Sequence, residues 1–363
     1  MSMLAGLRVL EIADGLTDFG GRMLAELGAD VAVVLPDSCT NRARRLAWHH
    51  GKTILSPDDR QAIRKLAVKA DVVLDGQRNG DRFGLDEAVS DNTIYVRVSP
   101  FSAEGPYAGR PATDLTLFAL SGLMHVTGEP NRPPFKFPGQ QAYALTGIQA
   151  ATAALLGLYA RRRTGRGQKA DLSAFQSATL ANYREAIMYE WTGRIGRRHG
   201  NLLVRGKSGV RQIWPCKDGY VTWSMIDNPS MMRAVVSVME EKGAAGELSR
   251  IDWENTLVAN TPQETIERWE AIIADFFAGH TREELGNWSL KLGWGLSVIY
   301  SPEDVRDSEH LKARGLFVTV TDEETGKAVS VPGPLFRSAQ TDAPRRTLGK
   351  PVPASTFTGW GEQ

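Results

Sequence analysis

Residues 4–36 read LAGLRVLEIADGLTDFGGRMLAELGADVAVVLP, and this stretch decides the class of the fold. The apolar run at 7–12 predicts a buried strand, and the run at 30–35 predicts a second strand that stops at Pro36. Between them, residues 19–28 carry apolar side chains at helical spacing and end at a glycine, which is typical of an α-helix. The stretch therefore predicts a strand–helix–strand unit.

The same alternation continues along the chain. Residues 57–70 resemble a helix, with Ser56 as the expected N-cap and Pro57 at the first helical position, where no N–H is needed. Residues 71–75 and 93–98 predict further strands. Strands that alternate with helices indicate a parallel sheet, so the predicted fold class is α/β with a Rossmann-like arrangement.

The first predicted strand is not followed by the dinucleotide-binding fingerprint. The chain runs ADGLTDFGGR over residues 13–22, where that fingerprint would read GxGxxG. A nicotinamide or flavin dehydrogenase is therefore disfavoured.

The length of 363 residues predicts two domains. We expect a large Rossmann-like domain at 1–205, a smaller α+β domain at 206–325, where the chain becomes rich in glycine and turns, and a return to the large domain at 326–363. Residues 112–187 are expected to be mostly helical. Within them, residues 147–160 are apolar almost all round and predict a buried helix.

The charge and the cysteines exclude several classes of function. The chain carries 43 Lys+Arg against 42 Asp+Glu, so no overall field would attract nucleic acid or an anionic membrane. Cys39 and Cys216 are far apart and follow no metal-binding spacing, so we expect two free thiols and no metal. With no predicted signal peptide or membrane span, a cytoplasmic protein is expected.

Short motifs in a fixed order give the chain a resemblance to a known family. Taken together with residues 4–36, they resemble the class III CoA-transferases, the carnitine dehydratase and bile-acid-inducible type. This resemblance implies an inserted small domain, two chains interlocked as a dimer, and acyl-CoA as a substrate with no permanently bound cofactor. The motifs are His50-Gly51-Lys52, QRNG at 77–80, SAEGPYAGRPATD at 102–114, SGLM at 121–124, TGEP at 127–130, TGRGQ at 164–168, ARGLF at 313–317 and VPGPLFR at 331–337.

The resemblance also implies a catalytic aspartate, and the sequence lacks it. In this family the Asp carboxylate attacks the acyl-CoA thioester and forms a mixed anhydride. Counting back from the TGRGQ motif places Tyr143 at that position, and residues 130–170 contain no Asp or Glu. Tyr143 is open to three interpretations: an aromatic residue that lines the pocket, a residue that orients substrate, or a nucleophile with an ordinary pKa of about 10. Asp114 is a further candidate, either structural or catalytic.

Contacts to coenzyme A are expected at a few cations, because its phosphates need local positive charge. The resemblance places them at Lys52, at Arg78 and at the loop after the second strand. In that loop Arg42, with its neighbours Arg44 and Arg45, could meet the 3′-phosphate or form a solvated basic loop. Tyr107, in the motif at 102–114, is also expected at the coenzyme A site.

Three functions remain open. The first is a subunit of a heteromeric CoA-transferase that moves CoA between an acyl-CoA such as succinyl-CoA and an organic acid. A homologous partner would then supply the aspartate, as in the benzylsuccinate CoA-transferases, which the stretch at 213–221 also resembles. The second is a self-sufficient acyl-CoA enzyme with different chemistry. The third is a catalytically inactive CoA-binding homologue.

Aromatic residues bear on the acyl group. Phe135, Phe137 and Tyr143 surround the expected pocket, and the chain has nine tryptophans. A bulky or aromatic acid is therefore plausible. The tryptophans are equally suited to the cores of two domains.

Overall fold

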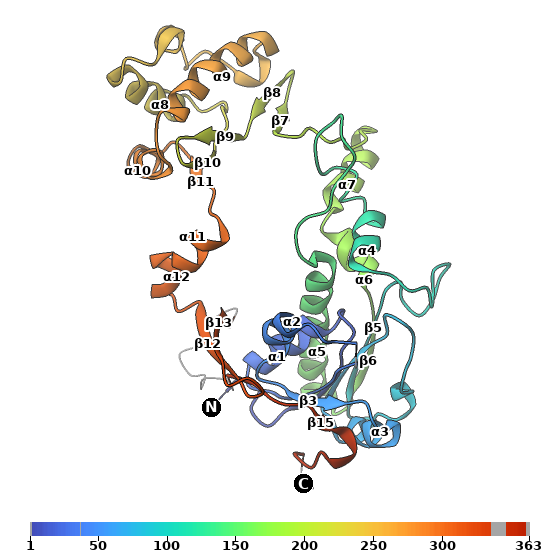
Figure 1. Cartoon of the computed structure of the whole chain (residues 1–363). Coiled ribbons are helices and arrows are strands. Elements are labelled where there is room, and N and C mark those ends of the chain that lie inside the picture. The colour runs from blue at the N-terminus through green and yellow to red at the C-terminus, as the bar shows by residue number, and fades with distance from the viewer. Residues whose placement is uncertain (1, 37, 335–345, 361–363) are drawn as a thin grey trace. The chain divides into compact units, whose positions relative to one another are not determined.

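The computed structural model describes residues 2–36, 38–334 and 346–360, and it divides into two compact units (Figure 1). The first unit comprises residues 1–125, 135–196 and 308–363, and the second comprises 126–134 and 197–307. Residues 335–345, which include the end of the VPGPLFR motif, lie outside the description.

These boundaries differ from those expected at 206 and 325. β12 (Phe317–Asp322), which was expected in the small domain, pairs with β13 (Ala328–Pro332) in the first unit. Val320 of β12 is buried together with Val33 and Ile54 of the large sheet. The chain therefore returns to the large unit earlier than the glycine pattern indicated.

A seven-stranded sheet forms the centre of the first unit, and all its described pairings are parallel. This confirms the predicted α/β class. Helices connect most of the strands because a parallel crossover needs a long connection. In spatial order the strands are β15 (Val352–Pro353), β3 (Thr53–Ser56), β2 (Asp30–Val34), β1 (Arg8–Ile12), β4 (Val72–Gly76), β5 (Ile94–Ser99) and β6 (Gln168–Ser173).

Alternate residues of the central strands enter two different cores. Val9 and Val31 are buried with α1 (Asp18–Glu26) and α5 (Gln141–Thr164). Leu10 and Ala32, one position later, are buried with α3 (Arg60–Lys69). Since successive side chains of a strand point to opposite faces, the sheet is covered by helices on both sides.

The two helices on the first face meet at a pair of glycines. A Cβ atom added to Gly20 of α1 would lie 2.7 Å from the carbonyl oxygen of Gly147 in α5. One added to Gly147 would lie 2.9 Å from the backbone nitrogen of Gly20. These glycines are needed because the two helix backbones approach too closely for a side chain. The contact fixes where α5 begins relative to β1.

Helix α5 differs from its prediction in one respect. Gly165 ends it at φ 69°, as expected for a C-cap glycine. However, Leu156 and Tyr159 are exposed in the isolated chain, so the prediction of burial all round is wrong. By length and hydropathy α5 is the one described helix that could cross a membrane. Core helices pass the same test, and α5 packs on α1 and β5.

The local helix starts also differ from the prediction. Helix α3 begins after Asp59, whose carboxylate accepts the N–H groups of Gln61 and Ala62, so Ser56 is not its N-cap. The segment after Pro36 was expected to be a loop and instead contains α2 (Arg42–His49), capped by Asn41. The remaining elements of this unit are α4 (Asp114–Leu120), α6 (Ala174–Leu180), α7 (Tyr183–Thr192), α12 (Glu309–Ala313) and β14 (Thr347–Leu348).

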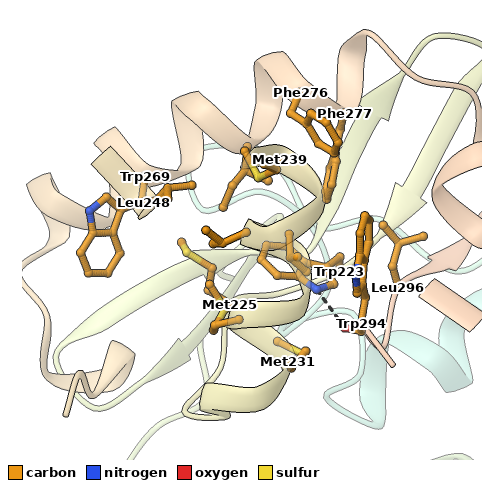
Figure 2. Packing of buried hydrophobic residues seen from close by; sticks show 14 of the residues in the cluster. Trp223, Met225, Met231, Met239, Leu248, Trp269, Phe276, Phe277, Trp294 and Leu296 are labelled. Atoms are coloured by element: carbon orange, nitrogen blue, oxygen red, sulfur yellow. Dashed lines mark hydrogen bonds between the residues drawn. The ribbon is translucent and has the colours of Figure 1, made fainter. Parts of the chain in front are cut away.

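The second unit has its own core of tryptophan, methionine and phenylalanine side chains (Figure 2). Trp223 donates its indole N–H to the carbonyl of Trp294 at 3.0 Å. Trp214, Trp253 and Trp269 are also buried there, so these tryptophans are core residues and do not indicate an aromatic substrate. The elements are β7 (Leu202–Arg205), β8 (Ser208–Arg211), β9 (Ile213–Cys216), β10 (Gly219–Thr222), α8 (Pro229–Glu241), α9 (Gln263–Ala278), α10 (Arg282–Leu292), β11 (Ser297–Val298) and α11 (Pro302–Asp307).

Candidate active site

A pocket of about 190 Å³ opens where the central strands of the large sheet end. Its walls come from residues 13–15 after β1, from residues 35, 36 and 38–41 after β2, from Arg78 after β4, and from Asp18, Arg44 and His49 of helices α1 and α2. The strand order reverses beside β1, because the chain runs from β1 to β2 on one side and from β4 to β5 on the other. In open parallel sheets this crevice beyond the carboxyl ends of the strands is where ligands bind.

Tyr143 lies in the first turn of α5, next to this pocket, and only 4% of it is exposed. Its hydroxyl accepts a hydrogen bond from Nη1 of Arg78 at 3.4 Å. Its backbone N–H donates to Oδ1 of Asp114 at 3.1 Å. The N-cap Gln140 makes no side-chain cap, so Asp114 caps this helix from a neighbouring element.

Asp114 therefore has a structural role in this geometry. Its second oxygen lies 3.3 Å from Nζ of Lys136, so both carboxylate oxygens have partners. The resulting arrangement anchors the start of α5 and holds Tyr143 beside Arg78.

Lys52 is fully buried, and this corrects the expectation that it contacts coenzyme A. Its Nζ donates to Oε2 of Glu11 at 2.7 Å and to the backbone oxygen of Asp18 at 2.9 Å. Neither the Lys52 nor the Glu11 side chain has any exposed area. In this structure the ammonium is enclosed by Glu11 and Asp18 beneath the pocket, and separating it from Glu11 would leave an uncompensated buried charge.

The charges around Lys52 are strongly coupled. Burial raises the pKa of Glu11 to about 7, although Lys52 opposes the rise. Burial would also raise the pKa of Asp18, but His49, Arg44 and Lys52 hold it well below its ordinary range. Burial and the charge of Lys52 lower the pKa of His49 to about 4, so the imidazole is neutral. Asp18 therefore remains a carboxylate whose main cationic partner at the pocket is Arg44, at 2.8 Å.

Asp14 is a pocket carboxylate that the sequence analysis did not identify. One of its oxygens accepts the N–H of Leu16 at 2.9 Å, and the other accepts the N–H of Arg78. Burial raises its pKa to about 6, and these hydrogen bonds oppose the rise. The available signal was its position directly after the first predicted strand, since such residues meet at one edge of a parallel sheet.

The other expected contacts lie away from the pocket lining. Nε of Arg42 donates to Asp322 at 2.7 Å, and its guanidinium also pairs with Glu324. Tyr107 is 41% exposed and packs against Phe101, with ring centroids 5.3 Å apart. Of the four residues proposed to bind coenzyme A, the structure brings Arg78 to the pocket and does not bring Arg42, Lys52 or Tyr107 there.

The two phenylalanines expected at the pocket are also elsewhere. Phe137 packs edge-on against Phe118, with centroids 5.6 Å apart, and Phe135 is exposed. Neither lines the pocket, which instead has Cys39 and Arg44 in its wall. The wall of the pocket is therefore polar and carries two arginines, Arg44 and Arg78, together with two carboxylates, Asp14 and Asp18. The Tyr143 ring lies beside it, in an adjoining small cavity that Phe19 and Trp48 also line.

Comparisons with known proteins identify the family of the chain. The model of CoA-transferase family III matches residues 4–354. Succinyl-CoA:(R)-benzylsuccinate CoA-transferase subunit BbsE of Thauera aromatica is 27% identical over 360 residues, covering 90% of this chain and 86% of that protein. Succinyl-CoA–L-malate CoA-transferase alpha subunit of Chloroflexus aurantiacus is 25% identical over 386 residues, covering 98% and 87%.

A solved structure shows the same fold. A CAIB/BAIF family protein from Brucella suis matches with a TM-score of 0.79 and 24% identity, covering 95% of both chains. The match of the family model over nearly the whole chain confirms the resemblance found in the sequence motifs, and this chain belongs to CoA-transferase family III.

Proposed function

We propose that this chain is the subunit of a two-subunit CoA-transferase that does not supply the catalytic carboxylate. The observation that carries the proposal is Tyr143 at the start of α5, beside Arg78 at the end of the pocket. Residues 130–170 contain no Asp or Glu, so a shift of several positions in the alignment would not restore a carboxylate. The neighbouring Asp114 has partners at both oxygens.

The names of two relatives support a partner chain. BbsE of Thauera aromatica is described as a subunit, and the Chloroflexus aurantiacus protein as an alpha subunit. By analogy, a homologous chain with the family aspartate would complete the enzyme. CoA would move between an acyl-CoA such as succinyl-CoA and an organic acid. We propose a cytoplasmic location for this enzyme.

Binding of coenzyme A to this chain is proposed at Arg78, at Arg44 and at those residues of the loop after β2 that line the pocket. Arg44 and Arg78 are cations at the pocket, and the loop after β2 contributes Ser38, Thr40 and Asn41 to its wall. Such groups suit phosphate oxygens, which accept several charge-assisted hydrogen bonds. Lys52 is left out of this set because its ammonium is buried against Glu11.

The test is purification of the lightly tagged chain from its native host, followed by native mass spectrometry and an assay of CoA transfer. A stoichiometric homologue with the aspartate, and activity only in the pair, is the expected result. A homodimer without such a partner would refute the proposal.

A stand-alone acyl-CoA enzyme is the second candidate, and Asp14 is the observation that favours it. Its carboxyl lines the pocket, and its pKa is raised to about 6. Turnover by the purified chain alone, lost in Asp14→Asn and kept in Tyr143→Phe, would support this alternative over the two-subunit enzyme.

A further inference from the structure

Two cavities meet at the start of α5 and share part of their walls. The larger, of about 190 Å³, contains Asp14 and Arg78, whereas the smaller, of about 10 Å³, contains Trp48, Gln140 and Tyr143. Gly15, Asp18 and Arg44 line both. The smaller cavity is therefore what remains of the space around the Tyr143 ring.

The ring lies directly against the loop after β1. A Cβ atom added to Gly15 would lie 2.8 Å from Cε2 of Tyr143 and 3.2 Å from Nη2 of Arg44. Gly15 also has φ 107°, a conformation that side chains other than glycine rarely adopt. The absence of a side chain at Gly15 thus makes room for the ring and the guanidinium together.

Tyr143 makes a hydrogen bond at its side-chain hydroxyl and another at its backbone N–H. Its hydroxyl receives the hydrogen bond from Arg78 at 3.4 Å, and its backbone N–H is bound to Asp114 at 3.1 Å. The second constraint fixes the first turn of a 24-residue helix, which also packs closely on α1 at Gly147. In this structure the ring is buried against Gly15 and fills the space beside the larger cavity.

We propose that Tyr143 is a specificity-determining residue, a steric divider that keeps the acyl-thioester end of acyl-CoA out of this chain's own pocket. The larger cavity stays open to the phosphate end of the same ligand class. This inference rests on the proposed function for the identity of the ligand. In the assembled enzyme it limits tight acyl-CoA binding to the partner's site.

The test measures binding to the enzyme as purified with its partner, by isothermal titration calorimetry. One probe is S-(2-oxopropyl)-CoA, an unreactive analogue of acetyl-CoA, and the other is adenosine 3′,5′-bisphosphate, which lacks the thioester end. Tyr143→Ala is expected to bind the first probe at this chain's site at least tenfold more tightly than the wild type. Its affinity for the second probe is expected to stay unchanged.

Tyr143→Phe is the matched control, because it removes the hydroxyl and keeps the ring. It is expected to bind both probes as the wild type does. If Tyr143→Ala fails to fold, the same binding measurements are made on Tyr143→Leu, because leucine keeps apolar packing but is smaller than the tyrosine ring. Equal affinity of the wild type and the folded smaller variant for the first probe would overturn the proposal, as would a gain shown equally by Tyr143→Phe.

Failure of the proposed function would be visible separately. If the chain purifies without an aspartate-bearing partner, the two-subunit enzyme is refuted. In that case a steric role for Tyr143 still predicts that Tyr143→Ala binds one equivalent of S-(2-oxopropyl)-CoA per chain tightly, while the wild type does not.

Discussion

Replacement of Lys52 by methionine separates a structural from a ligand-binding role for this residue. Lys52→Met keeps the length of the side chain and removes the ammonium that lies 2.7 Å from Oε2 of Glu11. Glu11 then remains fully buried without its cation. The outcome depends on how much that unpaired carboxylate costs.

Removing one partner of a buried ion pair costs about 3–5 kcal/mol, because the remaining charge is uncompensated in a poorly polarisable interior. For a folding unit of roughly 150–250 residues, 1 kcal/mol corresponds to a change in Tm of about 2–4 °C. Lys52→Met is therefore expected to lower the melting temperature of the large unit by about 6–20 °C. Burial raises the pKa of Glu11 to about 7 even with Lys52 holding it down, so without Lys52 the pKa rises further and protonation of Glu11 offsets part of this cost.

Thermal and urea unfolding followed by circular dichroism measure the effect. Lys65→Met is the matched control, since Lys65 is exposed on α3 and its replacement should change the free energy of unfolding by no more than about 0.5 kcal/mol. Adding Glu11→Gln to Lys52→Met is expected to recover most of the loss, because the unpaired carboxylate is removed and the remaining buried carboxylate, Asp18, keeps its partner Arg44. A Lys52→Met protein that melts like the wild type and loses affinity for coenzyme A would refute this reasoning and restore Lys52 as a ligand contact.

Three further predictions follow from other contacts. Gly147→Ala is expected to lower the free energy of unfolding in urea by about 1–3 kcal/mol, because the new Cβ would lie 2.9 Å from the backbone of α1. Gly279→Ala is the control and should change this free energy little, since no atom lies nearer than 3.5 Å to its Cβ. Asp59→Ala should cost about 0.5–2 kcal/mol through the lost cap, and Ser56→Ala should be near neutral; the reverse order would restore the predicted N-cap. Burial raises the pKa of Asp14 in the folded protein from 3.8 to about 6, so between these pH values the folded state binds the proton more tightly than the unfolded state does. As pH rises through this range, the free energy of unfolding of the wild type, measured relative to Asp14→Asn, should therefore fall by up to about 1.4 kcal/mol per pH unit. A difference that rises or stays flat would contradict this prediction.

The elements that sequence reasoning predicted well are those whose pattern is local. β1 and β2 are runs of apolar residues, and most of their side chains are buried. β6 was missed because it lies at the end of the sheet order, and most of its side chains are polar and partly exposed. Its strand conformation depends on pairing with β5, whose residues lie far away in the chain.

Helix α2 was missed for a related reason. It buries only His49 and carries three arginines, so its composition resembled a basic loop although Leu46 and Trp48 are apolar. Its arginines pair with distant acidic groups: Arg44 with Asp18 and Arg42 with Asp322. Partners of this kind cannot be predicted from spacing.

The prediction of the site was limited because the burial of a side chain depends on residues that are distant in the sequence. Lys52 and Arg78 looked equivalent as cations near expected phosphates. Only contacts across the fold separate them, since Glu11 lies 41 positions before Lys52. Arg78 follows β4, whose end faces the pocket, and its guanidinium reaches Tyr143. Both cations lie in family motifs, and what distinguishes Arg78 is its position just after a parallel strand that ends at the pocket.

The surroundings of Tyr143 bear on the choice between a functional subunit and an inactive homologue. Arg78 donates to the phenol oxygen of Tyr143, so the side chain at position 143 is not a carboxylate partner for that guanidinium. Arg44 is paired with Asp18, and both arginines remain in the wall of an open pocket. Arg78 has a carboxylate beside it in Asp14, which accepts its backbone N–H and whose pKa the charge of Arg78 lowers. A phosphate that binds in this pocket must therefore draw the two guanidinium groups away from Asp14 and Asp18. A functional subunit does this and an inactive homologue that has lost all binding does not, so binding of adenosine 3′,5′-bisphosphate to the wild-type chain separates the two.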